Sequence, residues 1–469
     1  LTYSVLNLLI YRREMMFSLY DKLQKLDSEG KSIKVAIVGL GQMGSSLVSQ
    51  IRNLRGMDVI AIANRDINRA ANIAKNLGIR EEEILLVEVD NKISDKNKTI
   101  DSISIKDSVD SKAKKKFEKA ARSGKVIIID DLSLLFEIDQ IDVVVDITGS
   151  PEAGAYIAFN SINNGKHIVT LNVEADTTIG PLLKKSADNA GVVYTVSAGD
   201  EPAALKELYD FASVLNLEVI AAGKGKNNPL DKTANPTTLK AYSKSKGTSP
   251  RMMTSFVDGT KSMVEMACFS NATGMIPDCR GMHGPKVNVC DLTKIFSLKK
   301  DGGILDKKGV VDFAIGDVAP GVFLIYTSDQ QIIRDELKYL LFGDGPNYLL
   351  YRPYHLTSIE APMSIAQAYF YGEPTIIPSN GLVSEVVTAV KRDLKCGEVL
   401  DGIGGYTVYG LIELYDTARK EGLLPIGLSE SCTLKCDIKK DKILKYSDVN
   451  LVEDSMILRL RKLQDNLVI

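Results

Sequence analysis

The chain has 469 residues, of which 45% are hydrophobic, a length that allows two or three domains with ordinary cores. Its 58 basic and 60 acidic residues nearly cancel, which argues against binding to nucleic acid or to an anionic membrane surface. Any anionic ligand must therefore be held by a local site, and we expect a small-molecule substrate.

The cysteines and the first residues bear on the compartment. None of the six cysteines belongs to a CxxC pair with zinc-site spacing, so we expect reduced thiols and a cytoplasmic protein. The apolar run 5–10 is too short to span a bilayer and precedes two arginines, the wrong order for a signal peptide. Because Met15 and Met16 precede a better helical pattern, we hypothesise that the leading stretch is an over-extended start.

The first regular elements have the order that a dinucleotide site requires. Apolar residues at helical spacing predict an amphipathic helix over 17–26. A β-branched run then predicts a strand over 33–38, glycines break it over 39–44, and a helix follows over 45–54. A second strand is predicted over 59–63.

A charged stretch, 81–124, interrupts this pattern. Its acidic and basic residues alternate, in the run 90–98 and in a lysine-rich helix over 112–122, so we interpret it as a solvated excursion rather than a nucleic-acid patch. Apolar runs between helical segments then resume and predict a doubly wound α/β domain that ends near residue 199. These runs are 126–129, 143–147, 167–171 and 192–196.

The second half has a different character. After a strand over 219–222, the sequence is rich in Gly, Asn and Pro up to Pro250, as is typical of a segment that lines a site. A helix is predicted over 259–270 and strands over 311–315 and 322–327, and short strands and glycine turns are predicted past residue 372, at 385–390 and 402–409. We therefore predict an N-terminal extension and helix (1–30), a Rossmann domain (31–200), an α+β substrate and dimerisation region (201–371) and a small β-rich domain (372–469).

The glycine turn predicts how a dinucleotide is held. Gly39 permits the tight turn, Gly41 lets a pyrophosphate approach the backbone, and Gly44 lets helix and strand pack closely. The helix that begins at Gln42 and Met43 offers free N–H groups and a partial positive charge to the pyrophosphate.

The end of the second strand bears on the choice of dinucleotide. An NAD enzyme usually carries an acidic residue there, whereas this chain has Asn64 and Arg65. We therefore predict NADPH in preference to NADH, with Arg65 as a contact; an ordinary solvated arginine is the alternative. Thr148 and Gly149 follow the fourth apolar run and are predicted to border the nicotinamide ribose, although a simple strand-to-helix turn would use similar residues.

Longer stretches resemble known families. The Rossmann half together with 146–149 resembles homoserine dehydrogenases, which carry a lysine where this chain has Asn172-Val173. The stretches 167–176, 256–266 and 271–285 resemble the second, non-classical type of 1-deoxy-D-xylulose 5-phosphate reductoisomerase, the reductoisomerase-like family, and the likeness runs from about residue 17 to 427. Residues 374–412 are similar to a SAF domain.

The resemblance implies a reaction. The family converts 1-deoxy-D-xylulose 5-phosphate to 2-C-methyl-D-erythritol 4-phosphate by carbon–carbon cleavage and rejoining, followed by hydride transfer from NADPH. Such chemistry needs a cation to polarise the carbonyl, an acid or base for hydroxyl protons, and donors for the phosphate. A homodimer and, as a further cofactor contact, Asn172 also follow from the resemblance.

Several residues are candidates for these tasks. Lys224, Lys226 and Asn227 follow a strand on glycine-flexed backbone; we assign carbonyl polarisation to Lys224, and substrate binding to Lys226 and Asn227, against the alternative of solvated lysines. Asp200 and Glu201 are acid, base or metal candidates, or else a helix cap. The remaining catalytic candidates are Lys261 and Glu265, which are otherwise a surface ion pair, and His283 in a constrained turn.

Three hypotheses remain open at this stage. The leading one is an NADPH-dependent reductase or reductoisomerase of a phosphorylated substrate, and a divalent metal is compatible with it although no local motif identifies one. The second is a homoserine-dehydrogenase-like reductase of a small aldehyde or sugar acid. The third, from another class, is a non-catalytic NADPH-binding sensor.

Overall fold

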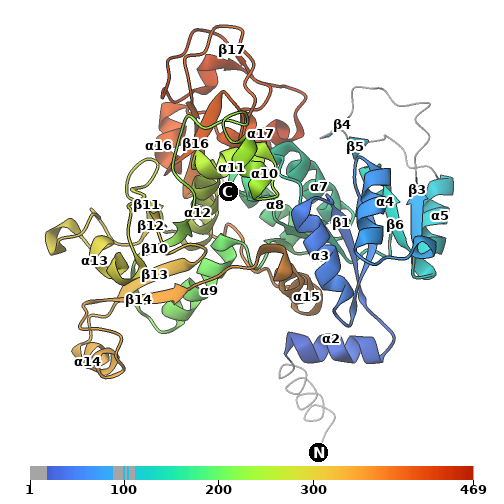
Figure 1. Cartoon of the computed structure of the whole chain (residues 1–469), viewed down its shortest axis with the longest axis horizontal. Helices are drawn as coiled ribbons and strands as arrows, with labels where there is room; N and C mark the ends of the chain where they lie inside the picture. The colour runs from blue at the N-terminus through green and yellow to red at the C-terminus, as the bar shows by residue number, and fades with distance from the viewer. Residues whose placement is uncertain (1–17, 88–98, 101–102, 105–110, 468–469) are drawn as a thin grey trace, which may run out of the picture.

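The computed structural model describes residues 18–87, 99–100, 103–104 and 111–467. The apolar run 5–10 and the charged run 90–98 lie outside these residues. A seven-stranded sheet with its helices and a separate five-stranded sheet lie side by side, and a β-rich C-terminal region lies across one end of both (Figure 1). Within the described part of the chain, no helix is both long and apolar enough to cross a membrane.

The first sheet confirms the predicted doubly wound α/β fold. Every strand pair in it is parallel, and the order is β3-β6-β2-β1-β7-β8-β9. Its strands are β1 (Ile33–Val38), β2 (Met57–Ala63), β3 (Ile84–Val87), β6 (Val126–Ile129), β7 (Val143–Asp146), β8 (His167–Thr170) and β9 (Tyr194–Val196). The strand order reverses between β1 and β7, so the turns after these two strands meet at a topological switch point.

Helices bury both faces of this sheet because its strands are apolar on both sides. One face packs against α2 (Leu19–Ser28), α3 (Gln42–Arg52), α4 (Ile67–Asn76) and α15 (Ala361–Tyr371). The other packs against α5 (Ser111–Arg122), α6 (Leu132–Phe136), α7 (Pro151–Asn163) and α8 (Val173–Ala190). Helix α15 therefore returns to the dinucleotide domain from the second half of the chain.

The second sheet is mixed, with the order β11-β12-β10-β13-β14. Its strands are β10 (Glu218–Lys226), β11 (Ile276–Pro277), β12 (Val310–Ile315), β13 (Val322–Thr327) and β14 (Asn347–Arg352). Its apolar residues divide between two cores: one contains α12 (Thr260–Thr273) and α9 (Glu201–Val214), and the other contains α13 (Leu292–Ile295). The predicted helix 259–270 and the predicted strands 311–315 and 322–327 are confirmed.

The remaining elements are short. Strands β15 (Ser384–Val390) and β16 (Val408–Leu414) form an antiparallel pair in the β-rich region. The segment 402–409, predicted among short strands and glycine turns, is a turn over residues 402–407, where Gly402 and Gly404 have φ values of +69° and +71°, and β16 begins at Val408. The others are β4 (Thr99–Ile100), β5 (Ile103–Ser104), β17 (Thr433–Leu434), β18 (Val449–Asn450), α10 (Lys240–Ser245), α11 (Pro250–Val257), α14 (Gln331–Tyr339) and α16 (Tyr415–Glu421).

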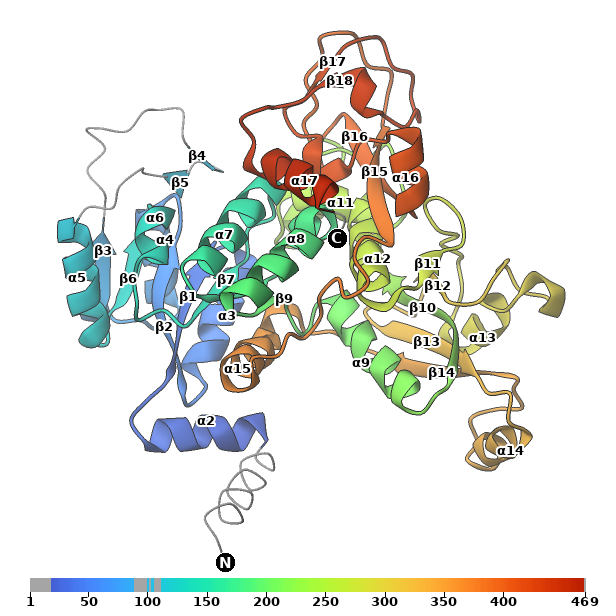
Figure 2. The same ribbon diagram turned by 180° about the vertical axis from the view of Figure 1, so that it is seen from behind.

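The last described helix, α17 (Met456–Asn466), hydrogen-bonds to α8 next to a proline in that helix. Pro181 lies inside α8, where a proline disrupts the ladder of hydrogen bonds. The N–H of Leu182 donates to Gln464 Oε1 at 3.0 Å, and the carbonyl of Thr178 accepts from Gln464 Nε2 at 3.2 Å. Arg461 Nη1 donates to the same carbonyl and pairs with buried Glu385. The two helices lie against α7 together (Figure 2).

We predict that Gln464→Leu destabilises the protein. The change leaves the buried N–H of Leu182 and one lone pair of the Thr178 carbonyl without partners, so the free energy of unfolding should fall by about 1–3 kcal/mol. Urea denaturation measures the effect. The exposed Lys462 on the same helix provides the control, because Lys462→Met should change stability by less than about 0.5 kcal/mol. Equal midpoints for both variants would contradict this account of the break in α8.

Candidate active site

The glycine turn after β1 has the geometry that its sequence predicts. Gly39 has φ of +100°, and a Cβ at this position would lie 3.1 Å from the carbonyl oxygen of Ile147, in the turn after β7. A Cβ on Gly44 would lie 2.1 Å from the carbonyl oxygen of Gly39. Only glycine permits both approaches, so the two turns at the switch point are in close contact.

The beginning of α3 fits a pyrophosphate. Gly41 is the N-cap, no side chain caps the helix, and a Cβ on Gly41 would meet nothing within 4 Å. Gln42 is exposed and Met43 is half-buried, with its sulfur 3.8 Å from Ser358 Oγ. The free N–H groups of this first turn therefore face open space, as a dinucleotide phosphate requires.

The acidic residue in the turn after β2, Asp66, caps the next helix. Asp66 accepts the N–H of Arg69 at 2.8 Å and caps α4, and Asn64 Nδ2 donates to the carbonyl of Asp66 at 2.9 Å. Arg65 is exposed beside them. The carboxylate of Asp66, in the turn where an NAD enzyme binds the ribose 2′-hydroxyl, is thus used as a helix cap. The cationic side chain of Arg65 lies next to it.

A buried hydrogen-bond network holds the other side of the switch point. Asp146 accepts the N–H and the hydroxyl of Thr148 at 2.8 and 2.6 Å. Asn172 caps α8 and donates to Thr148 Oγ1 at 3.2 Å and to the carbonyl of Ser150 at 2.7 Å. Burial raises the pKa of Asp146 to about 6, although the hydrogen bonds from Thr148 oppose the shift. Thr148 and Asn172 therefore shape the turn in which Gly149 remains open.

Asp146 gives a pH-dependent prediction. Its folded pKa of about 6 exceeds the usual value near 4, so the folded state binds the proton more tightly and loses stability as the pH rises from about 4 through 6. Asp146→Asn should remove this loss. The variant should gain up to about 3 kcal/mol relative to wild type between pH 4 and pH 7.5 in urea denaturation. An unchanged difference between the two pH values would refute the assignment; Asp139→Asn, at an exposed position, is the control.

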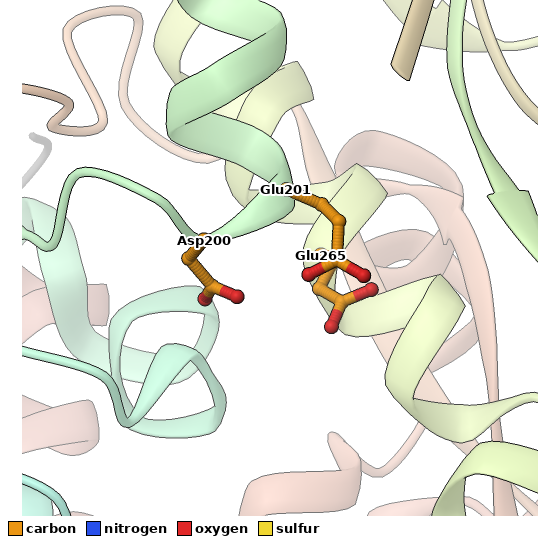
Figure 3. Close-up of side chains that lie close together, drawn as sticks. All are labelled: Asp200, Glu201 and Glu265. Atoms are coloured by element: carbon orange, nitrogen blue, oxygen red, sulfur yellow. The ribbon is translucent and has the colours of Figure 1, made fainter. Parts of the chain in front are cut away.

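The catalytic candidates meet at the carboxyl edge of the parallel sheet. Asp200 and Glu201 begin α9 after β9, and Glu265 comes from α12. Their carboxylates converge, with one oxygen of each within 4.8 Å of the others (Figure 3). The helix-cap alternative for Asp200 fails, because its side chain makes no capping hydrogen bond.

Lys224 and Lys226 lie within strand β10, which corrects the prediction that they lie on a flexible loop. Gly223 and Gly225 are there for close packing: a Cβ on them would lie 2.3 Å from the carbonyl oxygen of Asp312 and 2.2 Å from the nitrogen of Ala319. The strand therefore aims both lysines inward, and both are buried. Asn227, the next residue, is exposed.

Two lysines neutralise the cluster. Lys224 Nζ lies 2.6 Å from Glu201 Oε1 and also contacts Glu265. Lys261 Nζ donates to Glu174 Oε1 at 3.1 Å, so the alternative of an ordinary surface pair between Lys261 and Glu265 does not hold. Lys224 is buried and Lys261 is half-buried, and the carboxylates around each lysine raise its pKa against the effect of burial. Both lysines are therefore cationic.

Asp200 differs from its neighbours in charge. Burial raises its pKa well above the usual value, and the carboxylates Glu201 and Glu265 raise it further against the opposing effect of Lys261. Burial also acts to raise the pKa of Glu201, but Lys224 and His355 outweigh it and the net pKa is lowered. Asp200 thus binds a proton more tightly than the neighbouring Glu201 does. Its Oδ2 is buried and has no hydrogen-bond partner.

The three carboxylates do not fit a resident metal ion as they stand. Lys224 contacts both Glu201 and Glu265 and already supplies the positive charge that a divalent cation would bring. A metal would have to displace this ammonium group and take the proton of Asp200.

The other candidates are placed differently. Burial, with the nearby charge of Lys224, lowers the pKa of Lys226 to about 8, and its Nζ contacts the carbonyl of Phe256. His283 lies outside the cluster, with its Nε2 2.9 Å from Asp278 Oδ2. His283, a catalytic candidate in the sequence, is therefore not among the residues that the structure brings together in the cluster.

Two members of the site were not predicted. Glu174, in the first turn of α8, binds Lys261. His355, after β14, places Nε2 3.3 Å from Glu201 Oε1 and Nδ1 3.1 Å from the carbonyl oxygen of Gly199. A signal existed for Glu174, because it follows β8 at the edge where parallel strands bind ligands. No local signal marked His355, which comes from a distant segment.

Two family models match parts of the chain. Residues 199–361 match the model described as the catalytic domain of oxidoreductase DRL, and residues 21–153 match the shikimate/quinate 5-dehydrogenase model. No curated protein matches the chain.

Solved structures also show similarity. An NAD-binding oxidoreductase from Klebsiella pneumoniae is 16% identical over 44% of this chain and 45% of its own, with a TM-score of 0.28. Biliverdin reductase from Synechocystis sp. PCC 6803, in complex with biliverdin and NADP+, is 16% identical over 43% and 51%, with a TM-score of 0.26. The 3-ketoreductase KijD10 from Actinomadura kijaniata is 12% identical over 73% and 91%, with a TM-score of 0.34. The chain thus spans about half the length of the first two proteins.

The parallel sheet with its glycine turn is a dinucleotide-binding fold, and both matching family models describe oxidoreductases. The part that matches an oxidoreductase catalytic domain, residues 199–361, supplies most of the buried cluster. It contains Asp200, Glu201, Lys224, Lys261, Glu265 and His355.

Proposed function

We propose that this protein is an NADPH-dependent reductase that delivers a proton from Asp200 to a carbonyl substrate. One observation carries the proposal: a buried carboxyl group with a free oxygen and a raised pKa lies among paired lysines at the ligand-binding edge of a dinucleotide sheet. Perturbed acids in such a place are typical of active sites.

The residues divide the work as follows. Bound NADPH would supply the hydride. Asp200 donates the proton that the carbonyl oxygen takes up, and Lys261, whose charge lowers the pKa of Asp200, stabilises the carboxylate that remains. Lys224 holds Glu201 and Glu265 in place and contributes positive charge near the developing alkoxide.

For the substrate, we propose a small phosphorylated hydroxyketone, 1-deoxy-D-xylulose 5-phosphate, with rearrangement before reduction. The match of residues 199–361 to an oxidoreductase DRL domain and the resemblance of 167–176 and 256–285 support this choice. Lys226 and the exposed Asn227, at the end of β10, are the proposed phosphate contacts. We also propose that the protein forms a homodimer.

The substrate is tested by incubating purified protein with NADPH and 1-deoxy-D-xylulose 5-phosphate and identifying the product by mass spectrometry. Methylerythritol phosphate supports the full proposal. Turnover only with small unphosphorylated aldehydes favours a homoserine-dehydrogenase-like reductase, and NADPH binding without turnover of either class favours a sensor.

The acid is tested by Asp200→Asn. The variant keeps the shape of the side chain but loses its proton donor, so kcat should fall by about 100- to 10,000-fold while NADPH binding, followed by fluorescence, stays within about twofold. Asp210→Asn is the matched control, because Asp210 is an exposed residue on the same helix that pairs with Lys206. Equal kcat values for Asp200→Asn and wild type would exclude Asp200 as the acid.

The dinucleotide preference is tested by Arg65→Glu. A carboxylate at this position would repel the 2′-phosphate and accept a ribose hydroxyl, so the ratio of kcat/KM for NADPH over NADH should fall by at least about tenfold. Arg55→Glu is the control, because Arg55 precedes β2 and lies at the opposite edge of the sheet. If both variants keep the wild-type ratio, Arg65 is not part of the site.

A further inference from the structure

We infer that His355 is a proton-relay residue that returns protons from solvent to the buried acid through Glu201. The inference rests on the proposed function, because a carbonyl reductase consumes one proton in each turnover and Asp200 is buried. His355 would not touch the substrate, so its role is to supply the acid rather than to act as the acid.

The carbonyl of Gly199 decides which nitrogen of His355 exchanges its proton. A carbonyl oxygen can only accept, so Nδ1, at 3.1 Å from it, keeps its hydrogen in both charge states of the ring. The exchangeable proton is therefore on Nε2, which faces Glu201 Oε1 at 3.3 Å. A ring turned the other way would present its permanent N–H to Glu201 and could not pass a proton on.

The side chains of His355 and Glu201 are both partly exposed to solvent. The side chain of His355 is 15% exposed, that of Glu201 is 13% exposed, and that of Glu265, on the far side of Lys224, is 2% exposed. Imidazole exchanges protons with water near neutral pH more readily than any other side chain. We therefore assign the collection of a proton from solvent to His355.

The path continues from Glu201 to Asp200. One carboxylate oxygen of Glu201 lies within 4.8 Å of one oxygen of Asp200, and the pKa of Asp200 is raised whereas that of Glu201 is lowered. When Asp200 has given its proton to the substrate, a proton on His355 Nε2 moves to Glu201 and from Glu201 to Asp200. The neutral imidazole then takes a proton from water, and every group returns to its starting charge.

The charges around His355 leave its exchange with Glu201 undisturbed. Arg352, three residues earlier, is held by Glu360 at 2.7 Å and by Glu207 at 2.9 Å. Glu360 also accepts the N–H of Leu356. The carboxylate that faces the ring from α9 is Glu201, and the nearest cation behind it is Lys224 on β10.

The segment that carries His355 is held in place by backbone contacts. The N–H of Thr357 donates to the same Gly199 carbonyl at 2.8 Å, and Ser358 contacts Met43 at the first turn of α3. A bound dinucleotide and the proton relay would therefore lie against the same short segment. This placement fits a residue that replenishes the acid between hydride transfers.

The test compares His355→Gln with His283→Gln in the full chain, with NADPH and 1-deoxy-D-xylulose 5-phosphate. His283 also pairs with a carboxylate, Asp278, but lies outside the cluster, which makes it a matched control. We expect kcat of His355→Gln to fall by about tenfold or more, with a larger solvent deuterium isotope effect, and we expect added imidazole to restore it. The single-turnover rate should stay within about twofold, which also shows that the variant is folded. His283→Gln should match wild type throughout.

Two results would overturn the relay alone: a wild-type kcat in His355→Gln, or a loss that affects the single-turnover rate equally and that imidazole does not rescue. A wild-type protein that binds NADPH but reduces neither 1-deoxy-D-xylulose 5-phosphate nor a small aldehyde overturns the proposed function and the relay with it. The two failures are therefore distinguishable.

Discussion

The cluster around Lys224 depends on one constraint: a charge taken out of water must be paired. Lys224 lies between Glu201 and Glu265, and Lys261 binds Glu174. These side chains come from α8, α9, α12 and β10, so the pairing joins the dinucleotide domain to the five-stranded sheet. The same constraint raises the pKa of Asp200, because the group is buried and the carboxylates of Glu201 and Glu265 lie beside it. The burial of these charged groups thus accounts both for the contacts between the two parts of the chain and for the raised pKa of Asp200.

The dinucleotide half could be predicted from the sequence because its signals are local. A strand, a glycine turn and a helix follow one another within 20 residues, and the contacts of Gly39 and Gly44 are made within that unit and its parallel neighbour. The apolar runs also gave strand positions to within one or two residues, as at Val126–Ile129. Periodicity and turn chemistry are sufficient when neighbours in sequence are also neighbours in space.

The catalytic half was harder to predict because its partners are distant in sequence. Gly223 and Gly225 suggested a flexible loop, but they are required by close packing against Asp312 and Ala319 within a sheet. Lys261 and Glu265 have the spacing of a surface ion pair, yet each binds a residue from another element. His355 is more than 150 residues from Glu201. No pattern within one helix or strand carries this information.

The join between α8 and α17 bears on the order of events during synthesis. The hydrogen bond from Leu182 to Gln464 spans 282 residues, so the broken turn of α8 has no partner while most of the chain is still unmade. A nascent dinucleotide domain that has left the ribosome would carry an open backbone N–H and carbonyl, and it would also lack α15 on its sheet. Such a domain offers an unsatisfied helix turn and bare apolar surface to molecular chaperones until the last helix emerges.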